Sequence, residues 1–155
     1  MTKPSNSSHK PHQVGVGVAA FVCNQGKFIF QKRHGAHGAN TWAPPGGKLD
    51  FGESPEHGII REIKEETDLD IANVTYLGYT NDVFADDGLH YITLWFCGTS
   101  TNKNAVITEP EKCLEQRWFS LNDIPDVLFL PTINILADEK AVYKLNKLQK
   151  DGSLV

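Results

Sequence analysis

The segment GKLDFGESPEHGIIREIKEETDL, residues 47–69, is the stretch from which the fold of this chain can be inferred. Within it, Ser54, Pro55 and Glu56 have the composition of a helix start. Serine caps free backbone N–H groups, proline suits the first helical position, and glutamate is favoured near the positive end of the helix dipole. We therefore predict a helix that begins at Pro55 and runs to about Thr67.

The predicted helix carries a cluster of negative charge. Three glutamates lie along one arc of the helix, while isoleucines occupy the neighbouring arc. The glutamates are Glu62, Glu65 and Glu66. Like charges three and four residues apart are unfavourable, so the cluster calls for a cation, and ligands that are all oxygen favour a hard divalent ion such as Mg²⁺. The competing interpretation is a solvated helix face, which the surrounding residues make less favoured.

The spacing of the whole segment resembles the Nudix box. That family pattern is Gly, five residues, Glu, seven residues, Arg-Glu-aliphatic, one residue, Glu-Glu, one residue, Gly and an aliphatic residue. The chain departs from it only at the late glycine, where Asp68 stands. The resemblance implies an α+β fold, an α/β/α sandwich with a mixed β-sheet, and hydrolysis of a phosphoanhydride. Because Asp tolerates the left-handed conformation better than most residues, we expect an altered helix exit at small cost.

The resemblance also implies which residues hold the metal and move the proton. The metal is expected to be Mg²⁺, with Mn²⁺ as a substitute. Its expected ligands are Glu62 and Glu66, followed by Glu65 and the backbone carbonyl of Gly46. The general base is either Glu65 or Glu111, since the family places it within the box or on a later loop.

A second pair of charged residues has a structural role in the resemblance. Glu53 lies just ahead of the helix and Arg61 lies two turns inside it, so the pair can bridge the loop and the helix. The resemblance implies a structural brace for the catalytic loop. A place for Glu53 near the metal is the less favoured alternative.

Motifs outside the segment resemble the MutT-related branch of the family, which includes plant cytosolic Nudix hydrolase 1 and the human thiopurine-linked Nudix hydrolase. These motifs are FQKRHGAHGANTWAPPGGKLDFGES, TNDVF, HYITLWF and EPEKCLEQRWFSLNDIP. The branch implies a pyrophosphatase that converts nucleoside triphosphates, normal or oxidised, such as 8-oxo-dGTP, to a monophosphate and pyrophosphate. Phe84 and Asp86 stand where ADP-ribose and dinucleoside polyphosphate hydrolases tend to carry Pro and Tyr.

Other substrates and another class of function stay open. The plant relative suggests an isoprenoid diphosphate, and a nucleotide sugar is a further organic diphosphate. A module that senses nucleotides without cleaving them is the alternative of another class, and it predicts loss of the metal glutamates. Isopentenyl diphosphate isomerase is disfavoured because no cysteine of this chain lies in a motif typical of that enzyme.

Six residues are candidates to line the substrate pocket: Arg33, Gly47, Phe84, His90, Trp118 and Phe129. A guanidinium can pair with phosphate oxygens, aromatic rings can stack on a base, and glycine lets the backbone approach phosphate closely. The competing interpretations are a surface charge for the arginine and core positions for the aromatic residues.

Composition limits the class of protein. With 155 residues, of which 40% are hydrophobic, we expect one domain at residues 14–150 behind a flexible polar tail at residues 1–13. A net charge of -4 with scattered basic residues argues against a nucleic acid polymer as partner. No apolar run approaches the roughly 20 residues that span a bilayer. We expect a cytoplasmic protein with a small-molecule partner, and the resemblance adds a homodimer.

The remaining elements follow from β-type runs and turn residues. We expect a hairpin of residues 14–23 and 28–32, and a loop at residues 33–47. Further strands are expected at residues 71–80, 91–98 and 116–121. A final helical segment opens at Pro131, ends before Gly152 and covers the core.

Overall fold

The computed structural model describes residues 12–35 and 37–152, which form a seven-stranded sheet. Residues 1–11 of the predicted tail lie outside the described residues. The strands are β1 (Val14–Asn24), β2 (Lys27–Arg33), β3 (Trp42–Ala43), β4 (Gly46–Lys48), β5 (Ala72–Phe84), β6 (Leu89–Thr99) and β7 (Cys113–Phe119). Their order is β3-β2-β1-β6-β5, with β4 on β1 and β7 on β2. The sheet is mixed, because β1 and β6 run parallel and the other pairs antiparallel.

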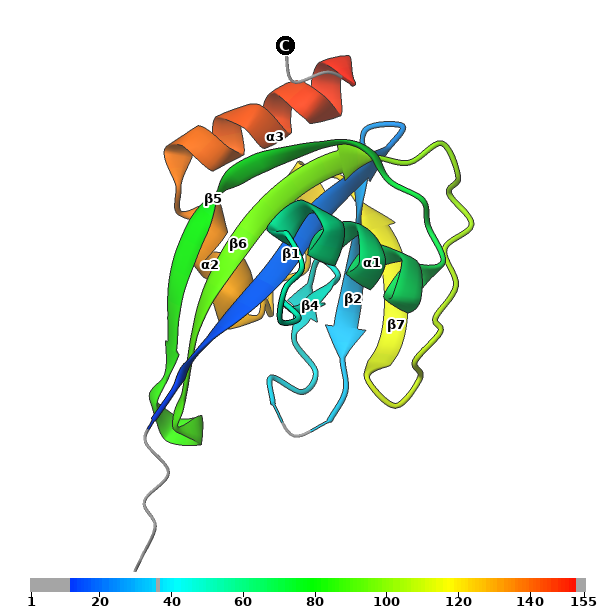
Figure 1. The fold of residues 1–155 in the computed structure, drawn as a ribbon. Helices are drawn as coiled ribbons and strands as arrows, with labels where there is room; N and C mark the ends of the chain where they lie inside the picture. Colours follow the sequence, from blue (N-terminus) through cyan, green and yellow to red (C-terminus); the bar gives the residue numbers. More distant parts are fainter. Residues whose placement is uncertain (1–11, 36, 153–155) are drawn as a thin grey trace, which may run out of the picture.

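Helices cover both faces of the sheet (Figure 1). Helix α1 (Pro55–Thr67) lies on one face, where Ile59 and Ile63 are buried against the sheet. Helices α2 (Leu130–Leu136) and α3 (Glu139–Asp151) lie on the other face, where Leu145 and Leu148 are buried. Short 3₁₀ turns occur at Ala85–Asp87 and Leu121–Asp123. The predicted α/β/α sandwich is confirmed.

Strand β1 joins the two layers. Side chains alternate across a strand, so Val18, Ala20 and Val22 pack with α1, while Phe21 and Cys23 pack on the side of α3. Both faces of β1 are therefore buried, which explains its nearly continuous apolar sequence.

Helix α1 has the predicted bounds. The Ser54 hydroxyl accepts a hydrogen bond from His57 N at 3.2 Å, and Pro55 occupies the first turn. At the other end Asp68 takes the left-handed conformation itself, with φ 59°, and its N–H donates to Lys64 O at 3.0 Å. The helix thus ends in the way a glycine would end it, and the altered exit expected from Asp68 is not found.

The C-terminal segment consists of two helices where the sequence indicated one helical stripe. Asp138 interrupts it, because its carboxylate accepts hydrogen bonds from Lys140 N and Ala141 N and so caps a new helix. An N-cap signal inside an apolar stripe can therefore divide it.

No helix within residues 12–35 and 37–152 is long and apolar enough to cross a membrane.

The left-handed conformation of Asp68 gives a prediction for stability. Asp68→Gly and Asp68→Asn are expected to change the free energy of unfolding by less than about 1 kcal/mol, because both residues adopt this conformation readily. Asp68→Val is expected to lower it by about 1–2 kcal/mol, because a β-branched residue is strained there. Urea unfolding measures all three, and equal tolerance of Val and Asn would contradict the explanation.

Candidate active site

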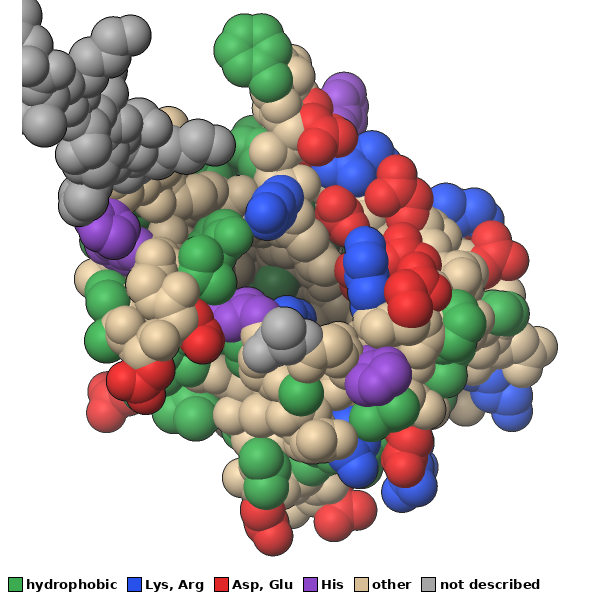
Figure 2. All heavy atoms as spheres, turned by 90° about the horizontal axis from the view of Figure 1, so that it is seen from below, with side chains coloured by type: hydrophobic (Ala, Val, Ile, Leu, Met, Phe, Trp, Pro, Cys, Tyr) green, Lys and Arg blue, Asp and Glu red, His purple; other side chains and the backbone are tan. Residues whose placement is uncertain are grey.

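A cavity of about 520 Å³ opens between α1, the centre of the sheet and the start of α2. Figure 2 shows the hollow, with charged side chains around its rim and an apolar interior. Seven of the residues predicted from sequence line it: Arg33, Gly46, Gly47, Glu62, Glu66, Phe84 and Phe129. Five separate segments of the sequence thus meet at one site.

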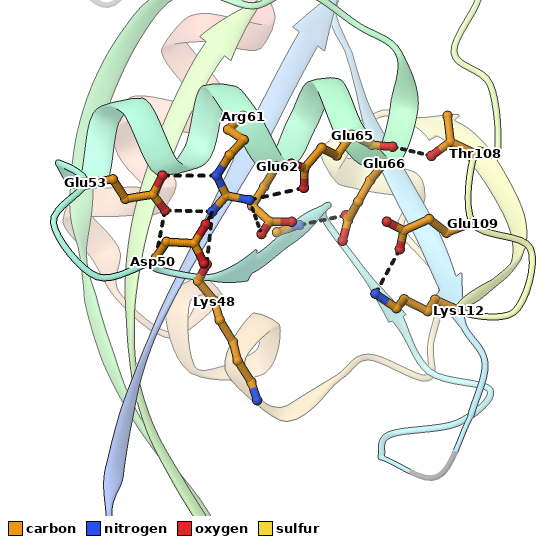
Figure 3. A network of polar contacts seen from close by, with 11 residues as sticks. Lys48, Asp50, Glu53, Arg61, Glu62, Glu65, Glu66, Thr108, Glu109 and Lys112 are labelled. Carbon is orange, nitrogen blue, oxygen red and sulfur yellow. Dashed lines mark hydrogen bonds and ion pairs between the residues drawn. The ribbon is translucent and has the colours of Figure 1, made fainter.

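Arg61 joins the loop before α1 to the helix. Its Nη2 and Nε donate to the Glu53 carboxylate at 2.6 and 3.0 Å, and Nη2 also donates to Lys48 O at 3.2 Å. Asp50 Oδ2 lies 3.3 Å from the same nitrogen. These contacts hold residues 48–53 against the helix, which is the geometry that a brace requires (Figure 3).

Arg61 also holds two of the helix glutamates. Its Nη1 lies 2.9 Å from Glu62 Oε1 and 3.1 Å from Glu65 Oε2. Glu66 instead accepts a hydrogen bond from Gly46 N at 3.2 Å, and Figure 3 shows it beside Glu109. No group of three His, Cys, Asp or Glu side chains is placed to hold a metal ion in the part of the chain described here.

The buried carboxylates nevertheless fit a divalent cation. Burial, together with repulsion from Glu62, raises the pKa of Glu66 to about 8. Burial also raises the pKa of Glu62, whose side chain is only 13% exposed. Two desolvated carboxylates side by side are costly as anions without a positive charge between them. The oxygen-only donor set of Glu62 and Glu66 suits Mg²⁺ or Mn²⁺.

The two glycines of β4 are required by close packing. A Cβ at Gly47 would overlap the carboxylate of Glu62, and one at Gly46 would overlap Val18 O. Glycine at both positions lets β4 fit between β1 and the acidic side of α1. The absence of a side chain thus makes room for the Glu62 carboxylate, a reason that the sequence alone did not indicate.

A carboxylate that sequence reasoning missed lies opposite Glu66. Glu109 lines the cavity, and its Oε2 lies 3.0 Å from Lys112 Nζ, which also lines it. The pKa of Lys112 is raised by that contact. Glu111, the predicted base on this loop, does not line the cavity. The loop contains Glu109, a proline and Glu111, and no periodicity in its sequence indicates which of the two glutamates faces the cavity.

The predicted stacking residues contact each other. The rings of Phe84 and Phe129 stack with centroids 5.4 Å apart, and Arg33 Cζ lies 3.9 Å from the centroid of Phe129. His37 packs edge-on against Phe84 at 4.3 Å and hydrogen bonds to Asp87 at 3.1 Å. Arg33 and Phe84 therefore both pack on the Phe129 ring, so a base that stacked where they lie would have to displace them.

The structure places three other predicted residues away from the main cavity. Trp118 donates to Lys103 O at 3.0 Å and packs against the core beneath α1. Glu65 is 51% exposed and ion-paired with Arg61. His90 contacts Asn81 and lines a separate depression of about 340 Å³.

Strand alternation accounts for the position of His90 and explains why Thr93 and Trp95, which were not predicted, line the cavity together with Tyr91. Neighbours on a strand point to opposite faces, so His90 and Tyr91 cannot both face the cavity from the same side of the sheet. Tyr91, Thr93 and Trp95 line the cavity, at intervals of two residues. A strand implies that side chains alternate between its two faces, but the sequence does not indicate which face of β6 borders the cavity.

The contact of Glu53 with Arg61 predicts a pH-dependent stability. Hydrogen bonds from Arg61 hold the pKa of Glu53 down to about 2, below its ordinary value near 4.3. Because the folded-state pKa is the lower one, the contribution is complete above pH about 4.5 and is lost as pH falls through about 2. Glu53→Gln is therefore expected to be less stable than the wild type near pH 7, with a difference that shrinks below pH 4.5. Urea unfolding at several pH values measures it, and a pH-independent difference would count against the brace.

Known proteins resemble this chain over most of its length. The family model described as NUDIX domain matches residues 11–139. The 8-oxo-dGTP diphosphatase of Proteus vulgaris is 32% identical over 98 residues, which cover 62% of this chain and 85% of that protein. The 8-oxo-dGTP diphosphatase of Escherichia coli (strain K12) is 34% identical over 87 residues, which cover 56% of this chain and 64% of that protein.

A solved structure agrees with these matches. The MutT NUDIX hydrolase from Burkholderia pseudomallei superimposes with a TM-score of 0.76 at 29% identity, covering 82% of this chain and 98% of that one. Proteins named ADP-ribose pyrophosphatase and NAD-capped RNA hydrolase NudC also match. Because the family model extends over far more than half of the sequence, this chain belongs to the NUDIX domain family.

Proposed function

We propose that this Nudix hydrolase cleaves a phosphoanhydride bond of nucleoside triphosphates, normal or oxidised, and releases a monophosphate and pyrophosphate. The observation that carries the proposal is the pair of desolvated carboxylates, Glu62 and Glu66, in the wall of a cavity that also contains Arg33 and Lys112. Acidic and basic groups in one cavity suit a substrate with phosphates and a divalent cation. Relatives named 8-oxo-dGTP diphosphatase support the choice of substrate.

The proposed metal ligands are Glu62 and Glu66, with Glu65 and the Gly46 carbonyl completing the set. When bound, Mg²⁺ neutralises phosphate charge and acidifies water. For Glu65 to take part, its carboxylate must leave Arg61 Nη1, which now lies 3.1 Å away. Arg61 remains tied to Glu53 in that case, so the loop stays in place.

The remaining groups of the cavity have proposed roles in binding and proton transfer. Arg33 binds phosphate, because its guanidinium lies in the cavity wall and its hydrogen bonds to His37 O are long, at 3.3 Å. Among the candidate bases we favour Glu109 over Glu65 and Glu111, because it lines the cavity. A base must lie within reach of the proton that it accepts. The predicted homodimer and cytoplasmic location stay predictions.

Removing one carboxylate tests the metal assignment. Glu66→Gln is expected to lower Mg²⁺-dependent turnover by roughly 10–100-fold or more and to abolish the rise in Tm that Mg²⁺ causes in the wild type. In EDTA at pH 7 its Tm is expected to match the wild type, since the raised pKa of Glu66 keeps that carboxyl largely protonated. Glu56→Gln, which changes an exposed glutamate in the first turn of α1, is the matched control. Full activity of Glu66→Gln would contradict the assignment.

A substrate panel tests the reaction. The protein is incubated with dGTP, 8-oxo-dGTP, ATP, ADP-ribose, a nucleotide sugar and geranyl diphosphate, with Mg²⁺ or with EDTA, and products are separated by chromatography. At least one triphosphate is expected to yield monophosphate and pyrophosphate in equal amounts, and EDTA is expected to stop the reaction. Turnover of geranyl diphosphate alone would replace the proposal with an organic diphosphate hydrolase. Binding of nucleotides without turnover would indicate a sensing module.

A further inference from the structure

A buried polar network lies behind one wall of the cavity. Its centre is Asp82 on β5, which is 0% exposed. Asp82 Oδ2 accepts hydrogen bonds from Thr80 at 2.9 Å and Thr93 at 2.7 Å, and Oδ1 accepts one from Asn134 Nδ2 at 2.9 Å. The network therefore ties together β5, β6 and α2.

The direction of these hydrogen bonds is determined by chemistry. The indole N–H of Trp95 can only donate, and it donates to Thr80 Oγ1 at 3.0 Å, so the Thr80 hydrogen is directed to Asp82. Thr93 likewise gives its hydroxyl hydrogen to the carboxylate. Thr93 also lines the cavity. Its oxygen consequently has only lone pairs left for a ligand, so it acts there as an acceptor.

A second hydroxyl in the same wall has no partner. Thr132 lines the cavity at the start of α2, is 0% exposed, and its Oγ1 forms no hydrogen bond with any residue of the described part of the chain. Its neighbour Asn134 is held by Asp82, which fixes this turn of α2 against the sheet. A buried hydroxyl without a partner is unfavourable, and a ligand group that fills the cavity can supply that partner.

We infer that Thr93 and Thr132 determine substrate specificity through hydrogen bonds to a planar polar ligand, such as the edge of a nucleobase. Thr93 accepts from an N–H group of that ligand, whereas the Thr132 hydroxyl can either donate or accept. Asp82 is the positioning residue that makes Thr93 an acceptor. The inference deepens the proposed function and rests on it for the identity of the phosphate-bearing part. An isoprenoid chain has no polar group for these hydroxyls, so it would leave the buried Thr132 hydroxyl without a partner.

The test is binding without turnover. In EDTA, the Kd values of AMP, GMP, CMP and UMP are compared with those of ribose 5-phosphate, which has no base, and geranyl phosphate, by calorimetry. At least one nucleotide is expected to bind about tenfold or more tightly than both reference compounds. Thr93→Val and Thr132→Val are each expected to raise the Kd of that nucleotide by about threefold to tenfold and to leave the Kd of ribose 5-phosphate unchanged.

Stability measurements separate a binding role from a structural one. Thr132→Val removes an unpaired hydroxyl at nearly constant volume, so its Tm is expected to equal or exceed that of the wild type. Thr67→Val is the matched control, because Thr67 is equally buried, lies outside the cavity and donates to Ile63 O at 2.6 Å. It is expected to lower Tm and leave nucleotide affinity unchanged.

The outcomes distinguish this inference from the proposed function. Unchanged nucleotide affinity in both Thr93→Val and Thr132→Val would overturn the inference, even if triphosphates are hydrolysed. Geranyl phosphate binding as tightly as the best nucleotide would also overturn it. Selective nucleotide binding that both variants weaken, in a protein that hydrolyses no triphosphate, would support the inference and reject the proposed reaction.

Discussion

The ion-pair network of Arg61 is the interaction on which the geometry of the site depends. One guanidinium contacts Glu53 and Asp50 in the loop and Glu62 and Glu65 on the helix. Arginine suits this role because its planar group presents several donors in a fixed arrangement and stays charged. The pKa of Arg61 is raised further by its hydrogen bonds to Glu53. The loop, the short strand β4 and the acidic side of α1 thereby become one unit.

The cavity combines two kinds of chemistry because it lies where that unit meets the other layer of the sandwich. Near α1, Glu62 and Glu66 are crowded and desolvated, which prepares them for a cation. Near α2, hydrogen bonds donated to Asp82 fix which polar groups of the cavity wall are still able to accept a hydrogen bond. The first arrangement suits the reacting phosphates, and the second suits recognition of the rest of the substrate. Substrate choice within a widely used fold depends on such local groups.

Much of the fold was predictable because its signals are local. The helix start at Ser54 and Pro55, the hairpin of β1 and β2, and the strand expected at residues 91–98 depend on capping, turn chemistry and β-type composition. Two of the errors also have local causes. Asp138 capped a second helix inside one apolar stripe, and Asp68 took the left-handed conformation without disturbing the helix end.

The sequence by itself determined the family, the acidic side of α1 and the pairing of loop and helix through Glu53 and Arg61, because these depend on spacing within one segment. Only the tertiary structure decided that Glu109 lines the cavity while Glu111 does not, that the rings of Phe84 and Phe129 cover each other, and that Thr132 has a buried hydroxyl without a partner. These features arise where strands and helices distant in sequence come together. The direction of a side chain in such a place depends on packing between layers, which no local pattern records.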